Sequence, residues 1–113
     1  MQNFSKKYRI KKKSEIYGTF KNGHRFLCED YKIVFSENKE NFDRIAVLVS
    51  RKTGNAVKRN KIKRFFREVF RKNRIDFPPF FDVLIQPQSG IDLNNEMVQC
   101  YKKWQEKAKR LVL

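Results

Sequence analysis

The chain of 113 residues has few of the residues that build metal centres and disulfide frameworks. It contains two cysteines, Cys28 and Cys100, and a single histidine, His24. The two cysteines lie far apart and form no Cys-x-x-Cys pattern, so neither a zinc site nor a structural disulfide is predicted. We expect both to be free thiols in a reducing compartment.

Long hydrophobic runs are also missing. No apolar stretch approaches the roughly 20 residues of a membrane-spanning helix, and the charged N-terminus lacks the apolar segment of a signal peptide. The basic run over residues 6–13 has no bulky apolar face beside it, which argues against binding to a membrane surface. These absences predict a soluble, cytoplasmic protein that needs no membrane partner.

Carboxylates are few and scattered. The chain has 12 Asp and Glu against 27 Lys and Arg, and a net charge of +15. The acids in residues 37–43 come nearest to a cluster, but we expect them to form a solvated hairpin turn, with a weak divalent-cation site as the alternative. The chain has neither a phosphate-binding P-loop nor a Gly-x-Ser-x-Gly motif. We therefore predict no catalytic residue and no dedicated metal site in the polypeptide.

Positive charge is concentrated between residues 51 and 74, which hold eleven Lys or Arg and one acid, Glu68. Apolar residues recur there at helical spacing, so the segment predicts a helix with one apolar face. That face carries Ile62, Phe65, Phe66, Val69 and Phe70, and the opposite side carries the cations. Fixed cations on a rigid helix suit a polyanion, above all nucleic acid. A merely solvated charged face is the alternative.

The remaining pattern predicts one domain over residues 1–113, with residues 1–8 as a flexible basic arm. Ser14 suits an N-cap of a short helix that carries Ile16 and Phe20 and ends at Asn22-Gly23. Strands are predicted near residues 26–28 and over 31–36, 44–50 and 81–86, and the last helix from about residue 93. In residues 44–50, alternation places Ile45, Val47 and Val49 on one side. This order, α-β-β-β-α-β-α, predicts an α/β (α+β) two-layer sandwich of three helices on about four strands.

The segment from Ser50 to Arg71 closely resembles the signature of the protein subunit of bacterial ribonuclease P. That signature runs approximately S-[KR]-K-x-G-x-A-V-x-R-N-[RK]-[IL]-K-R-x-x-R-E-x-[FY]-R, and this chain reads SRKTGNAVKRNKIKRFFREVFR. Residues 9–23 (RIKKKSEIYGTFKNG) resemble the family's opening segment, R-L-x-x-x-x-[DE]-F-x-x-V-F-x-x-G. The order of the predicted elements also agrees with the family.

The resemblance implies an accessory subunit of a ribonucleoprotein that removes the 5′ leader from precursor tRNA. Its catalytic RNA would position Mg²⁺, so the implied partners are that RNA and precursor tRNA, and a protein homo-oligomer is not required. The implied fold contains a left-handed βαβ crossover, against the general right-handed rule. A structural RNA-binding protein, such as a ribosomal protein, is the alternative.

Carried over by matching positions, the resemblance implies RNA contacts along the basic helix and a leader cleft between the sheet and the first helix. The RNA-binding positions are Lys52, Arg59, Asn60, Lys61, Lys63, Arg64, Arg67 and Arg71. The cleft positions are Lys12, Phe20, Arg44, Leu48 and Ser50. Helical spacing with Ile16 allows Phe20 to be either a cleft or a core residue. Three departures concern contacts: Lys61 replaces an arginine fork, Ile16 stands where the family usually has Phe, and the last strand ends Ile85-Gln86-Pro87 where many members have Arg or Lys.

Overall fold

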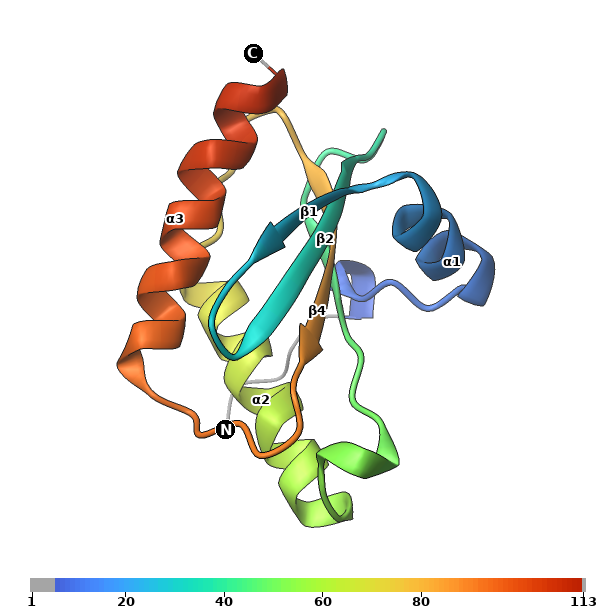
Figure 1. Ribbon diagram of the computed structural model, residues 1–113. Coiled ribbons are helices and arrows are strands. Elements are labelled where there is room, and N and C mark those ends of the chain that lie inside the picture. Colours follow the sequence, from blue (N-terminus) through green and yellow to red (C-terminus); the bar gives the residue numbers. More distant parts are fainter. Residues whose placement is uncertain (1–5, 113) are drawn as a thin grey trace.

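The computed structural model describes residues 6–112. It has a four-stranded sheet and three α-helices (Figure 1). The helices are α1 (Lys13–Asn22), α2 (Ala56–Lys72) and α3 (Asn95–Val112), and the strands are β1 (His24–Leu27), β2 (Tyr31–Glu37), β3 (Arg44–Val47) and β4 (Phe81–Pro87). Two short 3₁₀ helices, η1 (Lys6–Tyr8) and η2 (Arg51–Thr53), precede α1 and α2. The predicted fold class and element order are confirmed.

The strands lie in the order β1-β2-β4-β3. β4 pairs antiparallel with β2 and parallel with β3. The predicted hairpin between the second and third strands is therefore wrong, because β4 lies between them. β4 is buried from Phe81 to Ile85, so it needs a neighbour on both edges and cover on both faces. β3, α2 and β4 form a βαβ unit, and its left-handed crossover stays a prediction.

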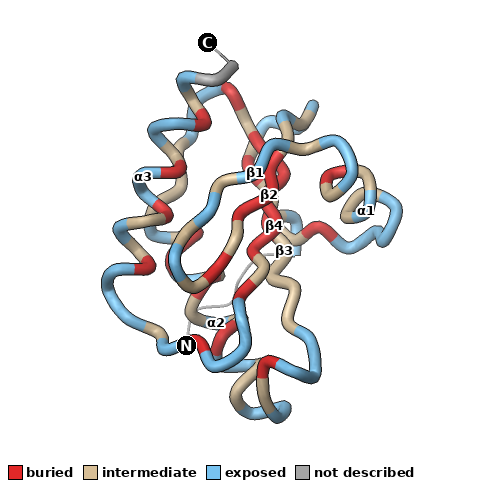
Figure 2. Tube along the Cα trace, in the orientation of Figure 1, coloured by how far each residue is buried: buried red, intermediate tan, exposed pale blue. Residues whose placement is uncertain are grey.

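Helices cover both faces of the sheet, but unequally. α2 and α3 pack on one face, where the main core includes Ile33, Phe35, Val83 and Trp104. α1 lies against the other face (Figure 2). There it covers a smaller cluster centred on Val34 and Leu84. The predicted alternation in residues 44–50 is confirmed. Ile45, Val47 and Val49 belong to the main core, and Ala46 and Leu48 belong to the α1 side.

α2 and α1 begin in different ways. Asn55 is the N-cap of α2, because its side-chain oxygen accepts a hydrogen bond from the Lys58 N–H at 2.9 Å. The predicted Ser14 cap is wrong. α1 begins at Lys13, and Lys12 occupies the cap position without a side-chain hydrogen bond. The chain just before α1 is tied to β3, since the Ile10 N–H donates to the Ile45 carbonyl at 3.0 Å, and this contact helps to set where the helix starts.

The predicted basic arm lies partly outside the described residues, which begin at Lys6. The part that is described forms η1. The Tyr8 ring packs against Phe42, with ring centroids 5.6 Å apart, and against Phe70 at 6.1 Å. The chain thus meets the body of the protein at Tyr8, within the segment predicted to be a flexible arm.

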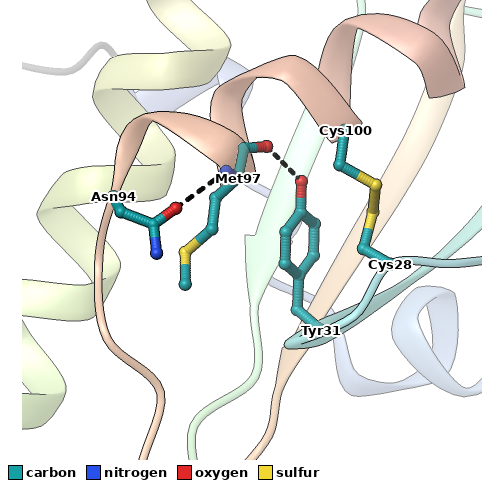
Figure 3. Close-up of a disulfide and its surroundings, with 5 residues drawn as sticks. All are labelled: Cys28, Tyr31, Asn94, Met97 and Cys100. Atoms are coloured by element: carbon teal, nitrogen blue, oxygen red, sulfur yellow. Dashed lines mark hydrogen bonds between the residues drawn. A yellow bond between two sulfur atoms is a disulfide. The ribbon is translucent and has the colours of Figure 1, made fainter.

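The two cysteines form a disulfide, so the prediction of free thiols is wrong (Figure 3). Cys28 follows β1 and Cys100 lies in α3, 72 residues apart in sequence but with Cα atoms 6.2 Å apart. Beside them the buried Tyr31 hydroxyl donates to the Met97 carbonyl at 2.6 Å. Burial raises the pKa of Tyr31, so this hydroxyl keeps its proton. Sequence spacing reveals only local Cys pairs, and this one depends on how α3 packs on the sheet.

Within residues 6–112, none of the helices combines the length and the apolar character needed to cross a membrane.

Candidate nucleic-acid interface

The cations of α2 face outward because the apolar side of the helix is buried. Ile62, Phe66, Val69 and Phe70 pack into the main core, and Phe65 is partly buried beside them. We name the opposite side the α2 cationic surface. On it, Asn60, Lys61 and Arg64 are exposed, and Arg59, Lys63 and Arg67 are half-buried. The predicted helical register is confirmed, and Lys52 in η2 extends the surface toward the N-terminus.

Charge pairing divides the predicted RNA-binding residues into two groups. Arg71 is held by Glu68, to which its Nε donates at 3.2 Å. This hydrogen bond, the largest cause, raises the pKa of Arg71 and lowers that of Glu68. Within the described part of the chain, the cations of the α2 cationic surface form no ion pair with a carboxylate. Their charge is available to an external anion.

Arg9 adds a cation that the sequence analysis missed. It lies next to β3, where it forms a bridge with Ile45, and its charge acts on Arg67. Burial, the larger cause, and the charge of Arg9 both lower the pKa of Arg67. A bound phosphate would relieve this repulsion, which makes the end of the surface near Arg67 favourable for an anion. No periodicity in the sequence could have placed Arg9 there.

A shallow groove runs along one side of α1, and we name it the α1 groove. Its lining is mostly apolar, with a lysine toward each end: Lys13, Ile16, Tyr17, Phe20 and Lys21. The strand register places Leu27, Lys32 and Gln86 in one row across β1, β2 and β4. This row lies on the α1 face, two residues from Val34 and Leu84, which contact the helix. Apolar rings flanked by cations suit single-stranded nucleic acid.

Phe20 belongs to both the core and the groove. It is half-buried against the Val34–Leu84 cluster and also lines the α1 groove. The Lys32 ammonium lies 5.8 Å from the centroid of its ring. Tyr17, one helical turn before Lys21, was missed by the sequence analysis, yet it is 67% exposed. Its ring offers aromatic surface in the groove where Ile16 lacks it.

Two of the other predicted cleft residues lie beside α1. Lys12 is exposed at the start of α1, and Leu48 is half-buried on the α1 side of the sheet. Ser50 is exposed, and its hydroxyl lies 3.5 Å from that of Thr53. Arg44 differs from a free cleft cation, because its guanidinium is bound to Asp82 and Glu15. The structure therefore places Lys12 and Leu48 beside α1 and Ser50 at the N-cap of η2, and it leaves Arg44 without a free charge.

The described residues do not suit a bound metal ion. Nowhere between residues 6 and 112 do three His, Cys, Asp or Glu side chains come together as ligands. The acidic loop that follows β2 is no exception, because its buried Asp43 accepts a hydrogen bond from the Phe81 N–H at 2.7 Å. The described residues instead form the α2 cationic surface and, on the other face of the sheet, the α1 groove with a lysine toward each end.

Known proteins are similar in sequence to this chain across most of its length. The sequence profile of the family described as Ribonuclease P matches residues 4–112. The chain belongs to the ribonuclease P family. The ribonuclease P protein component of Petrotoga mobilis is 39% identical over 93 residues, which cover 82% of this chain and 79% of the relative. That of Thermotoga maritima is 31% identical over 97 residues, covering 86% and 83%.

Solved ribonuclease P proteins share the fold. The Staphylococcus aureus protein superposes with a TM-score of 0.74 at 32% identity, covering 90% of this chain and 95% of the other. The Thermotoga maritima protein gives a TM-score of 0.65 at 28% identity, with 91% of each chain covered. The resemblance read from residues 50–71 is confirmed, and nothing in these comparisons favours a ribosomal protein.

Proposed function

We propose that the chain is the protein component of a ribonuclease P and binds the RNA of that enzyme through the α2 cationic surface. One observation carries the proposal: the arginines and lysines of this surface lie on a rigid helix and have no carboxylate partners among the described residues. Neutralising phosphates with such residues releases counterions, which is the main source of affinity for RNA. Lys52 and Arg9 extend the contact beyond the helix at either end.

We further propose that the α1 groove holds the 5′ leader of precursor tRNA. A leader is single-stranded, and aromatic side chains bind single strands by stacking on bases. Phe20 and Tyr17 supply the rings, and Lys13, Lys21 and Lys32 supply charge for the leader phosphates. The groove and the α2 cationic surface lie on opposite faces of the sheet, so one molecule can contact the enzyme's RNA and its substrate together.

In this proposal the chemistry belongs to the RNA. The reaction is hydrolysis of the phosphodiester bond that joins the leader to the mature tRNA, and Mg²⁺ held by the RNA serves it. The described side chains do not form a metal site, so no step is assigned to this chain. Its contribution is to reduce the repulsion between two polyanions and to hold the leader. We place the complex in the cytoplasm, with precursor tRNA.

Reconstitution tests the proposal. Protein alone, the cognate RNA alone, and the two together are mixed with precursor tRNA at low millimolar Mg²⁺. We expect the complex to cleave and the protein alone to leave the substrate intact. In the complex, Phe20→Ala should weaken binding of precursor tRNA by about 1–3 kcal/mol, the contribution of one stacked base, and leave mature tRNA unaffected.

Two results would contradict the proposal. Cleavage at the mature 5′ end by RNA-free protein would place the chemistry in the polypeptide. An equal loss of affinity for precursor and mature tRNA in Phe20→Ala, with a collapsed melting temperature, would show that Phe20 serves only the core. Thermal melting of the variant beside the affinity ratio separates the second case from a role in leader binding.

A further inference from the structure

Arg44, the first residue of β3, is the centre of a charge network that joins α1 to the sheet. Its Nε donates to Asp82 Oδ1 at 2.8 Å, and its Nη2 donates to Asp82 Oδ2 at 2.7 Å. The same Nη2 also donates to Glu15 Oε2 at 2.9 Å. Asn38 adds a hydrogen bond to Asp82 Oδ1 at 2.9 Å. The network therefore ties the first turn of α1 to β3 and β4.

The sheet register explains why Arg44 points toward α1. Arg44 is the partner of Asp82 in the parallel pair, so the two side chains lie on the same face. Each comes two residues before a residue of the α1 cluster, Ala46 and Leu84. Only 14% of the Arg44 side chain is exposed. The hydrogen bond to Asp82, the largest cause, raises the pKa of Arg44, so the guanidinium remains charged.

α1 has few other polar contacts with the sheet. The Thr19 and Ser36 hydroxyls lie 3.5 Å apart, and Arg25 Nη2 in β1 donates to the Phe20 carbonyl at 3.2 Å. Glu15–Arg44 is the one ion pair of α1 within residues 6–112. The helix has ten residues, and in isolation a helix shorter than about 12–15 residues is marginal. Among the described residues, Glu15 thus supplies the one charged contact between the sheet and the N-terminal half of this helix, which carries Ile16 in the α1 groove.

We infer that Arg44 is a positioning residue for the leader. It acts through Glu15 and α1 to set the shape of the α1 groove, and it does not bind a leader phosphate itself. The inference rests on the proposed function, in which that groove holds the leader. It replaces the role that the family resemblance implied for Arg44, because the fork of the guanidinium is already filled by two carboxylates.

Glu15→Gln is the decisive variant, because it removes the charge from the network and keeps the shape of the side chain. Glu37→Gln is the matched control: it changes the net charge equally, at an exposed residue that forms no described ion pair. Both are compared with wild type in the reconstituted complex, by affinity for precursor tRNA and for mature tRNA at several salt concentrations. Arg44→Lys keeps the charge and loses the fork.

We expect Glu15→Gln and Arg44→Lys each to lower the ratio of the affinity for precursor tRNA to that for mature tRNA by about fivefold. A partly exposed ion pair can contribute a factor of this size. The salt slope should stay unchanged, and Glu37→Gln should match wild type.

If Arg44 were a phosphate ligand, Glu15→Gln would remove one of the two carboxylates that compete with phosphate for it, raise precursor affinity and steepen the salt slope. That result, or an unchanged ratio, would overturn the inference. A wild-type complex without preference for the leader would instead overturn the proposed function.

Discussion

Arg64 provides the sharpest test of how the α2 cationic surface binds RNA. Its side chain is exposed on the side of α2 opposite the buried Ile62 and Phe66. No carboxylate in the described part of the chain pairs with it. A phosphate would therefore be its first strong partner, and no existing ion pair has to be broken. We predict that Arg64→Ala weakens binding of the catalytic RNA without changing the fold.

The size of the effect follows from counterion release. One phosphate contact contributes about 0.7–0.9 to the slope of log K against log salt. Loss of that contact should make the slope shallower by the same amount. If wild type and variant bind equally at 1 M salt, the variant then binds about four- to fivefold more weakly near 0.15 M salt. The free energy of unfolding should change by less than about 0.5 kcal/mol, because the exposed side chain leaves the core intact.

The assay is a titration of fluorescently labelled catalytic RNA with protein at four or more salt concentrations. Lys103→Ala is the control, since Lys103 is exposed on α3 and its loss changes the net charge equally. An equal loss of affinity in both variants would show that only the net charge matters, and would refute a defined surface on α2. An unchanged slope with lowered stability would show that Arg64 packs within the fold.

Two further predictions concern stability. Reduction of the Cys28–Cys100 disulfide should lower the free energy of unfolding by about 2–4 kcal/mol, because the bond closes a long loop in the unfolded chain. RNA affinity should not change. Urea titrations with and without a thiol reductant measure the effect on stability. The two titration curves would coincide if the sulfurs were not bonded. Asp43 is 6% exposed, and burial, the largest cause, raises its pKa from 3.8 to about 6. Protonated Asp43 therefore stabilises the fold at low pH, and this contribution, about 3 kcal/mol, is lost as the pH rises through about 4 to 6. Between pH 4 and pH 7, the free energy of unfolding of wild type, measured in urea, should fall by about 2–3 kcal/mol relative to that of Asp43→Asn. A rise in this difference would contradict the assigned pKa shift.

Features that depend on neighbouring residues could be read from the sequence. The apolar spacing from Ile62 to Phe70 predicted which side of α2 is buried, because helical periodicity is a local property. Asn55 could be recognised as a cap because a capping side chain bonds only two or three residues ahead. The alternation around Ile45 assigned both faces of β3 correctly for the same reason.

Features that depend on distant residues could not be read in this way. β4 carries no alternation, since every residue from Phe81 to Ile85 is buried. The sequence predicted a strand there, but not that it lies between β2 and β3. The disulfide was missed because Cys28 and Cys100 meet only when α3 packs on the sheet. Both errors come from long-range contacts that no local pattern encodes.

The candidate site shows the same limit at the level of single side chains. Sequence patterns placed cations on α2 but could not tell that Arg71 is paired with Glu68 and Arg64 is not. Likewise, the resemblance placed Arg44 in the cleft, but its carboxylate partners lie on α1 and β4. Whether an arginine is free for RNA depends on which acids the fold brings within about 4 Å, and this requires the tertiary structure.

β3 links the two proposed surfaces of the protein. Ile45 and Val47 face the core that supports α2, and Arg44 and Ala46 face α1. A shift of one residue in the β3–β4 register would exchange these faces, exposing the apolar side chains to α1 and burying the arginine beneath α2. The bidentate contact between Arg44 and Asp82, which are register partners, favours the observed alignment. The residue that we assign to positioning the leader groove therefore also helps to fix the sheet register that supports the RNA-binding helix.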